Sequence, residues 1–311
     1  MSAHTPESTP AAEPKRVAVL APGGVGGLLA GALARDGRAV TVVATEPTAA
    51  HIAQHGLRVD SAVLGDFRVD VPAVPAATEP ADVVVVAPKA TALEGALERV
   101  PPHLAEGALV LPLLNGFEHM GLLRSRYPGA HVLGAAIRVE STRTEPGRIA
   151  QTSPFADLDI AYSGAPPERV EGLAAALRSA GLGVRLSDDE HAVLWRKFQF
   201  LLATALVCTH NRSDIGTART ERRDDLVGVA DEVAAVSAVG GPVLDTGRVV
   251  AMFEAAPART KPSMLRDLEA GRPMEVDALG GALLRAAERV GVAVPVVERL
   301  VADLRRLDPA G

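Results

Sequence analysis

The chain has 311 residues and a formal net charge of −6, from 32 basic and 38 acidic residues. This mildly acidic balance argues against general nucleic-acid binding, which usually requires a basic patch or domain. The length predicts two domains. Hydrophobic residues make up 48% of the chain and aromatic residues 3%, so we expect a core built mainly of Ala, Val and Leu. The one cysteine, Cys208, excludes an internal disulfide, argues against a cysteine-based metal cluster and fits a reducing, cytoplasmic setting.

Two N-terminal stretches raise the question of targeting. Residues 1–15 are rich in Pro, Ser, Thr, Ala and Glu and lack a charged-then-apolar signal pattern, so they are expected to form a disordered leader. Residues 17–34 are all apolar, Gly or Pro, a run long enough to approach a membrane helix. However, Pro22 and the glycines at positions 23, 24, 26 and 27 interrupt its middle, which favours a strand, a tight turn and a helix. We therefore expect no membrane partner.

Strand-like and helix-like segments alternate along the first half of the chain. In order, we predict a strand at Arg16–Leu20, a helix at Val25–Arg35, strands at Ala39–Ala44 and Val83–Ala87, a helix at Thr91–Arg99 and a strand at Ala108–Leu111. Two β-like stretches, Val132–Glu140 and Leu158–Ala161, a helix at Arg169–Ser179 and a strand at Val184–Leu186 follow. The alternation predicts a Rossmann-type, doubly wound α/β sheet.

After Ser187 strand signals largely stop and helical spacing dominates. The predicted helices are His191–Thr209, Asp224–Val239, Val249–Glu254, Asp277–Val290 and Val296–Leu307. We therefore predict an α/β fold with two domains, a dinucleotide-binding Rossmann domain over residues 16–187 and an all-helical substrate domain over residues 188–307.

A glycine-rich turn, residues 21–26 with the sequence APGGVG, follows the first predicted strand. A dinucleotide fingerprint places Gly-x-Gly-x-x-Gly between a strand and a helix. Gly23 and Gly26 occupy the second and third glycine positions, and Ala21 replaces the first. We predict that Gly23, Gly24, Val25 and Gly26 seat a cofactor pyrophosphate at the helix N-terminus. The alternative is an ordinary tight strand–helix turn.

The end of the second strand bears on the choice between NAD and NADP. An acidic residue there can bind the ribose 2′-OH of NAD, whereas an arginine suggests NADP. Thr45 and Glu46 occupy this position, and the next arginine along the chain is Arg58. Taken by themselves, these residues favour NAD or leave the choice between NAD and NADP open. We expect Thr45 to contact the cofactor. The alternative for Glu46, which is at least as well supported, is a solvated carboxylate without a ligand.

Polar residues at the ends of the next two strands are candidate ligands. Lys89 follows the valine-rich strand, and Asn115 precedes Gly116 after the strand beyond it. The carboxyl ends of parallel strands border the ligand crevice of such folds, so both side chains are expected to face cofactor or substrate. The alternatives are a solvated lysine and a simple Asn-Gly turn.

Lys197 lies among aromatic residues in a strongly apolar predicted helix. Trp195, Phe198 and Phe200 surround it in the sequence, which would partly desolvate the amine. Desolvation favours the neutral amine and makes a lysine a better proton donor near neutral pH. Reduction of a carbonyl requires such a donor at the developing alkoxide. The alternative is a lysine that extends to solvent at a domain edge.

From Arg16 to Leu307 the chain resembles the ketopantoate reductase (2-dehydropantoate 2-reductase) family. The resemblance rests on five segments: Gly23–Gly27, Lys89, Leu114–Gly116, Trp195–Lys197 and Ser263–Asp277. The last segment is the most specific, because a Ser-Met-Leu run with Asp and then Glu ahead of the closing helix rarely arises by chance.

The resemblance implies a reductase of pantothenate biosynthesis with NADPH as hydride donor. It implies that Lys197 is the catalytic lysine and proton donor, and that Glu275 is a carboxylate that orients substrate and lysine and lies at the cofactor. Ser263 resembles the hydroxyl that binds the substrate carboxylate. Asn115 and Lys89 resemble residues that contact both cofactor and substrate. We expect NADP, with NAD as the alternative, no metal, and a small-molecule substrate, and we leave open a homodimer.

Three positions depart from the family pattern. Leu201 and Ala205 replace asparagines expected one and two turns after Lys197 on the same helix face, and Thr45 replaces an arginine used for the NADP 2′-phosphate. Loss of buried amides removes discrimination for a polar substrate. Two alternatives therefore stay open: a related enzyme acting on a less polar carbonyl or imine, and a non-catalytic dinucleotide-binding relative.

Overall fold

The computed structural model describes residues 13–308, so the first twelve residues of the predicted leader lie outside the described part. The chain divides into two compact units. The sheet unit comprises the residues up to Ala87, Ala96–Leu113 and Arg126–Asp188, and the helical unit comprises Pro88–Gly95, Leu114–Ser125 and the residues from Asp189 on. The predicted division at residue 187 stays a prediction, because two segments of the first predicted domain belong to the helical unit.

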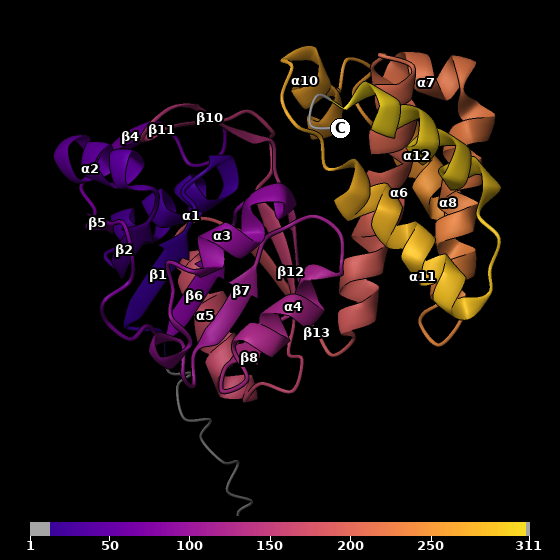
Figure 1. The fold of residues 1–311 in the computed structure, drawn as a ribbon. Coiled ribbons are helices and arrows are strands. Elements are labelled where there is room, and N and C mark those ends of the chain that lie inside the picture. Colours follow the sequence, from indigo (N-terminus) through magenta and orange to yellow (C-terminus); the bar gives the residue numbers. More distant parts are fainter. Residues whose placement is uncertain (1–12, 309–311) are drawn as a thin grey trace, which may run out of the picture. The chain divides into compact units, whose positions relative to one another are not determined.

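A six-stranded parallel sheet forms the centre of the sheet unit (Figure 1). The strand order is β5-β2-β1-β6-β7-β8. The strands are β1 (Arg16–Leu20), β2 (Ala39–Val43), β5 (Ala73–Val74), β6 (Val83–Val86), β7 (Leu109–Pro112) and β8 (His131–Val132). All four valines of β6 are buried, as expected for a strand covered on both faces. The predicted Rossmann-type sheet is confirmed, and so is a core dominated by Ala, Val and Leu.

The strand order reverses at β1, which pairs in parallel with β2 on one side and β6 on the other. Leu20 is in register with Val43 and with Val86, so the carboxyl ends of the three strands lie side by side. Ligands of open α/β sheets bind at such a reversal, outside the carboxyl ends. The glycine-rich turn therefore begins where the topology favours a ligand.

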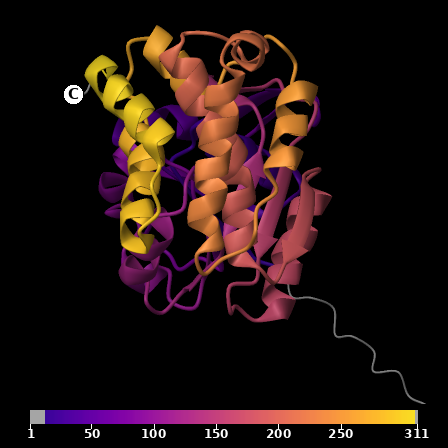
Figure 2. The same ribbon diagram turned by 90° about the vertical axis from the view of Figure 1, so that its right-hand side faces the viewer.

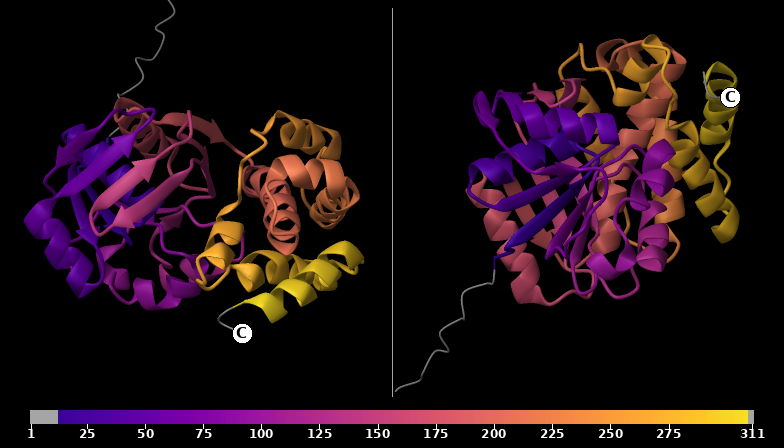
Figure 3. Two further views of the ribbon diagram at one scale, coloured as in Figure 1. Left: turned by 90° about the horizontal axis from the view of Figure 1, so that it is seen from above. Right: turned by 60° about the vertical axis from the view of Figure 1, so that its left-hand side comes forward.

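Two smaller sheets and four helices complete the sheet unit (Figure 3). One sheet has the order β10 (Ser141–Glu145), β11 (Arg148–Gln151), β3 (Leu57–Ser61), β4 (Phe67–Val69), and the other β13 (Gly183–Ser187), β12 (Asp157–Ala161), β9 (Ala135–Arg138). The helices are α1 (Gly24–Arg35), α2 (Glu46–His55), α5 (Pro167–Ser179) and the end of α3 (Leu93–Leu97), whose residues 93–95 belong to the helical unit.

Two predicted elements of the first half are wrong in extent. The stretch Val132–Glu140 is divided into β8 and β9, which belong to different sheets, and the chain turns between them at Gly134, whose N–H donates to the Ser163 hydroxyl. The predicted helix Thr91–Arg99 is a 3₁₀ turn followed by the short helix α3. Gly95 weakens this helix, and the prolines at 101 and 102 prevent its continuation.

The helical unit is built around α6 (Glu190–His210), and α8 (Arg223–Ala238), α11 (Ala282–Val290) and α12 (Pro295–Leu307) run alongside one another (Figure 2). The Asp189 side chain caps α6 by accepting a hydrogen bond from the Ala192 N–H at 2.8 Å. The other helices are α4 (His119–Arg126), α7 (Ile215–Glu221), α9 (Thr246–Ala255) and α10 (Ser263–Glu269). Cys208 is buried in α6.

The predicted helix Asp277–Val290 begins with a π-helical turn, η3 (Asp277–Gly281), before α11 continues as an α-helix. A side chain at Gly280 could not be accommodated, since its Cβ would lie 2.3 Å from Cγ2 of Val301 in α12. Single π turns are rare and are frequently found at functional sites. This one comes directly after Glu275 and Val276.

Helix α6 is long and apolar enough to cross a membrane by length and composition alone, but 78% of its apolar window is buried inside the protein. The apolar run 17–34 forms most of β1, the glycine-rich turn and all of α1 except its last residue, which confirms the predicted strand, turn and helix. Across residues 13–308, no group of three His, Cys, Asp or Glu side chains is placed to hold a metal ion.

Candidate active site and cofactor site

The glycine-rich turn begins with a strained residue. Ala21 has a φ of +64°, in the left-handed region that glycine adopts readily. Its N–H donates to the Val43 carbonyl at 2.9 Å, and its carbonyl accepts from the Gly23 N–H at 2.8 Å. The backbone shape of the fingerprint is therefore retained without its first glycine, at a cost of roughly 1–2 kcal/mol.

The glycines of the turn have two different surroundings. A Cβ on Gly24 would lie 2.1 Å from the Ser141 carbonyl oxygen, and one on Gly26 would lie 2.5 Å from the Ala21 carbonyl oxygen. By contrast, no atom lies within 4 Å of a Cβ built on Gly23. Gly24 and Gly26 thus allow close packing of α1, whereas Gly23 leaves open space over the backbone.

This open space suits a phosphate. Helix α1 has 12 residues, and Gly23, at its N-cap, supplies no side chain to cap the N–H groups of the first turn. Uncapped N–H groups at a helix N-terminus, next to open space, bind anions. The residues present therefore fit the pyrophosphate of a dinucleotide, with half-buried Val25 in the first turn of α1.

Thr45 and Glu46 are both exposed at the carboxyl end of β2. Thr45 is the N-cap of α2, and its hydroxyl donates to the Thr48 hydroxyl at 3.1 Å. Glu46 is the first residue of that helix. The predicted ribose position therefore holds one neutral and one acidic side chain.

Lys197 and Asn115, which were both predicted as site residues, contact each other. The Lys197 ammonium donates to Oδ1 of Asn115 at 3.0 Å. Aromatic packing fixes this arrangement: Phe117 stacks on Trp195, with ring centroids 4.6 Å apart, and meets Phe198 edge-on. The apolar helix around Lys197 thus docks the Asn115 loop against it.

The Asn115 loop requires the glycine that follows it. Gly116 has a φ of +84°, and a Cβ there would lie 3.1 Å from the Ala278 carbonyl oxygen in η3. The loop therefore approaches the π turn at a distance that only glycine allows without displacement.

Lys89 has a partner that sequence reasoning did not assign. Its ammonium donates to Oδ2 of Asp267 at 2.6 Å, and Oδ1 of Asp267 accepts from Nε of Arg272 at 2.9 Å. The Asp267 side chain is only 6% exposed, so this carboxylate is committed to its two cations. The sequence feature that could have pointed to Asp267 was its position inside the Ser263–Asp277 segment.

Glu275 and Ser263 lie in different surroundings. Glu275 is buried, and its Oε1 accepts a hydrogen bond from the Ala90 N–H at 2.9 Å. Ser263 is the exposed first residue of α10, and its hydroxyl has no hydrogen-bond partner among residues 13–308.

An ion network joins the Asn115 loop to the π turn, and sequence reasoning missed it entirely. Arg285 donates to both carboxylate oxygens of Glu118, at 3.0 and 2.6 Å, and to Asp277 at 3.1 Å. Arg305 donates to the same Asp277 at 2.7 Å. The network ties Glu118, three residues after Asn115, to Asp277, two residues after Glu275.

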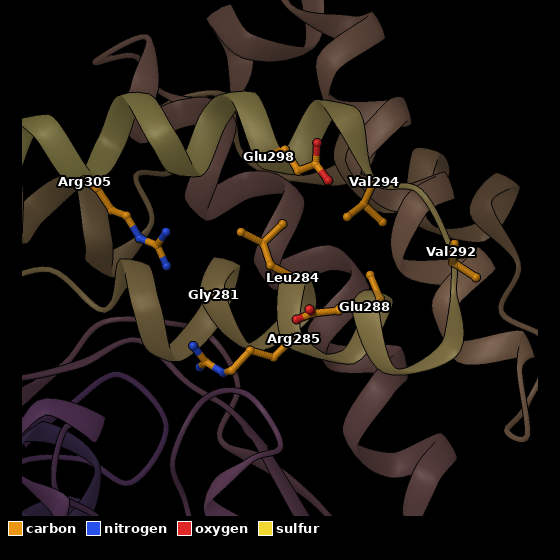
Figure 4. A pocket seen from close by; sticks show the side chains of 9 residues that line it. Gly281, Leu284, Arg285, Glu288, Val292, Val294, Glu298 and Arg305 are labelled. Atoms are coloured by element: carbon orange, nitrogen blue, oxygen red, sulfur yellow. The ribbon is translucent and has the colours of Figure 1, made fainter.

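A pocket of about 450 Å³ lies beside this network between α11 and α12 (Figure 4). It is lined by Gly281, Leu284, Arg285, Ala287, Glu288, Val292, Val294, Glu298 and Arg305. None of the residues predicted from the sequence lines it. Both of its arginines are paired with Asp277, so we assign the pocket no role.

His119 is a buried titratable residue that closely follows the Asn115 loop in the sequence. It is 7% exposed, and its Nε2 has no hydrogen-bond partner among the described residues. Burial, and secondarily the charge of Lys197, lowers the pKa of His119 to about 4. His119 is therefore neutral at physiological pH.

An open glycine turn at the strand reversal of a Rossmann sheet is typical of NAD(P)-dependent oxidoreductases. Two family models agree: "Ketopantoate reductase PanE/ApbA" matches residues 17–163, and its C-terminal counterpart matches residues 190–308. The chain belongs to the ketopantoate reductase family.

Individual relatives cover almost the whole chain. A 2-dehydropantoate 2-reductase of Halobacterium salinarum is 32% identical over 94% of this chain and 98% of its own length. The uncharacterized oxidoreductase YkpB of Bacillus subtilis is 29% identical over 92% of this chain and 97% of its own. The crystal structure of a PanE/ApbA family ketopantoate reductase from Ralstonia eutropha JMP134 has a TM-score of 0.85 at 29% identity, covering 94% of this chain and 98% of that one.

Proposed function

We propose that this protein reduces ketopantoate, or a related small 2-oxo acid, with NADPH or NADH, and that Lys197 is the proton donor. The hydrogen bond from Lys197 to Asn115 carries the proposal. Reduction of ketopantoate would place the enzyme in pantothenate biosynthesis. We further propose that it works in the cytoplasm.

The two lysines of the site donate hydrogen bonds to different groups. Lys89 donates to the buried carboxylate of Asp267, whereas Lys197 donates to the amide oxygen of Asn115. The bond to Asp267 occupies the Lys89 ammonium, which argues against Lys89 as the proton donor to a developing alkoxide. This supports Lys197 as the acid.

The reaction needs a hydride at the carbonyl carbon and a proton at the carbonyl oxygen. The nicotinamide, when bound, supplies the hydride. Lys197 donates the proton to the carbonyl oxygen, and Asn115 holds the ammonium in place. We propose that the exposed hydroxyl of Ser263 binds the substrate carboxylate and that the Glu275 carboxylate orients the substrate, while its bond from Ala90 fixes its position.

The cofactor would be held mainly by the glycine-rich turn, with Lys89 and Asn115 as further contacts. We propose NADP as the physiological cofactor, with NAD as the alternative. Support for a pyrophosphate site comes from the open space at Gly23 and the uncapped start of α1.

A second candidate is an enzyme of the same type that acts on a less polar carbonyl or imine. Leu201 and Ala205 follow Lys197 by one and two helical turns, half-buried and buried respectively. Apolar side chains on this face would favour an apolar substituent on the substrate. A purely cofactor-binding role is less well supported, because cofactor binding alone does not require Lys197.

The test measures oxidation of NADPH and NADH with ketopantoate and a panel of 2-oxo acids and imines. We expect Lys197→Ala to lower kcat by roughly 10²–10⁴-fold while the Kd of the cofactor changes less than about twofold. Lys261→Ala is the matched control, since this lysine pairs with Glu269 at an exposed position of the same unit. Full activity of Lys197→Ala would refute the assigned mechanism, and turnover of apolar ketones without ketopantoate would establish the second candidate.

A further inference from the structure

Arg99 extends its side chain to the carboxyl ends of two strands. Its Nη1 donates to the Ala44 carbonyl at 3.3 Å and to the Pro75 carbonyl at 2.8 Å. Ala44 directly follows β2 and Pro75 directly follows β5, which pair in parallel. Although Arg99 comes after α3, its guanidinium therefore lies at the same edge of the sheet as the glycine-rich turn.

This edge is where a dinucleotide presents its adenosine ribose. The turn and the β2 end are joined by the bond from the Ala21 N–H to the Val43 carbonyl. In Rossmann folds the ribose 2′ position is recognised at the end of this second strand, and a nearby arginine accommodates the 2′-phosphate of NADP. Thr45 occupies the strand end and carries no charge, whereas Arg99 brings a cation to the neighbouring carbonyl.

The contacts of Arg99 orient it for an anion. Both of its hydrogen bonds use Nη1 and both acceptors are neutral carbonyls, so its full charge remains. Within residues 13–308, its Nε and Nη2 have no acceptor, and the bond to Pro75 lies at the surface. Nε–H and Nη2–H form the parallel edge with which a guanidinium binds phosphate in a bidentate manner.

Arg169 shows what an arginine with a purely structural role looks like in the same unit. Its Nη1 donates to the Gly107 carbonyl and its Nη2 to the Asp82 carbonyl. Asp82 immediately precedes β6, so this arginine lies at the amino ends of the strands, away from the ligand edge. Arg169 divides its bonds between its two terminal nitrogens, whereas Arg99 keeps one edge available.

We propose that Arg99 binds the 2′-phosphate of NADP and takes the place of the missing strand-end arginine. This inference rests on the proposed use of NAD(P)H but not on the identity of the substrate. Glu46, exposed at the first position of α2, opposes the phosphate and lowers the discrimination that Arg99 provides.

The experiment measures equilibrium binding of NADPH, NADH, 2′,5′-ADP and 5′-AMP to the whole protein by calorimetry. We expect Arg99→Ala to weaken NADPH and 2′,5′-ADP by about 30-fold, the loss typical of a charge-assisted contact, and to leave NADH and 5′-AMP within about twofold. Arg169→Ala is the matched control and should change none of the four. Thr45→Arg in the Arg99→Ala protein should restore most of the preference for NADPH.

Two results would overturn the inference. Equal weakening of NADPH and NADH by Arg99→Ala would mean that Arg99 only holds the strand ends together. Failure of the wild-type protein to bind 2′,5′-ADP more tightly than 5′-AMP would mean that there is no 2′-phosphate site. The proposed function fails separately: Arg99-dependent NADPH binding without reduction of any 2-oxo acid would leave this inference standing and remove the substrate assignment.

Discussion

The candidate cofactor site of the sheet unit and the candidate catalytic site of the helical unit use different chemical groups. In the sheet unit, the turn after β1 offers backbone N–H groups and the absence of side chains at Gly23, Gly24 and Gly26. In the helical unit, the site consists of side chains held by other side chains, as in the pairs of Lys197 with Asn115 and Lys89 with Asp267. A backbone site should therefore be sensitive to an added methyl group, and a side-chain site to the loss of a partner or a change of charge.

The sharpest test of the backbone site compares two adjacent glycines. Gly24→Ala places a Cβ against the Ser141 carbonyl, and we expect it to destabilise the protein by about 3 kcal/mol or more. Gly23→Ala meets no protein atom, so its melting temperature should stay close to that of the wild type while its affinity for dinucleotide falls at least about tenfold. Thermal unfolding and cofactor titration separate the two effects. Equal stability of both variants would contradict the packing argument.

The helical unit should respond to pH through His119. Its pKa is about 4 in the folded protein and ordinarily 6.5, so the unfolded chain binds more protons between these values. Stability conferred by the neutral imidazole is therefore complete above about pH 6.5 and is lost as the pH falls toward 4, by about 3 kcal/mol in total.

Urea unfolding of wild type and His119→Gln across this pH range measures the loss. The variant should show a shallower acid dependence than the wild type, whereas His103→Gln, at an exposed position, should not. Parallel pH profiles for wild type and His119→Gln would show that the imidazole titrates normally in the folded protein.

A smaller effect distinguishes buried from exposed ion pairs on α10. Asp267→Asn removes a buried carboxylate that serves both Lys89 and Arg272, and we expect a loss of about 2 kcal/mol. Glu269→Gln removes the exposed partner of Lys261 and should cost less than about 0.5 kcal/mol. Denaturant titration of both variants decides whether side-chain pairing in this unit carries stability, and similar losses would argue that it does not.

The smallest expected effect concerns the strained residue of the turn. Ala21→Gly relieves roughly 1–2 kcal/mol of left-handed strain. It also adds unfolded-state freedom worth about 0.4–1 kcal/mol, so the net gain in stability should be about 0.5 kcal/mol. Ala34→Gly, within α1, is the control and should destabilise the protein. A loss of stability in Ala21→Gly would show that the left-handed backbone costs this alanine little.

Much of the fold was accessible from the sequence because it depends on local patterns. The valine run of β6, the strand–turn–helix around Gly23 and the long apolar helix α6 were each predicted within one or two residues of their observed limits. Short or polar elements, among them α2 and α10, were not predicted, because their apolar periodicity is weak over so few residues.

The side-chain partners of the site were much harder to predict. Asp267 is 178 residues from Lys89, and Arg285 is 167 residues from Glu118. No pattern within a window of sequence indicates which charges will meet at such separations. Asn115 was predicted from its position after a strand, and Lys197 from the aromatic residues around it. The family resemblance supported both predictions.

The burial of Cys208 in α6 has a consequence for redox chemistry. Burial raises the pKa of this thiol to about 12, so at neutral pH the reactive thiolate is present in only about one molecule in 10⁵. Because it is the one cysteine of the chain, the folded enzyme offers oxidants and alkylating reagents almost no thiolate. Its activity should therefore persist in peroxide or iodoacetamide, and the rate at which the thiol is labelled should report how often α6 is exposed by unfolding.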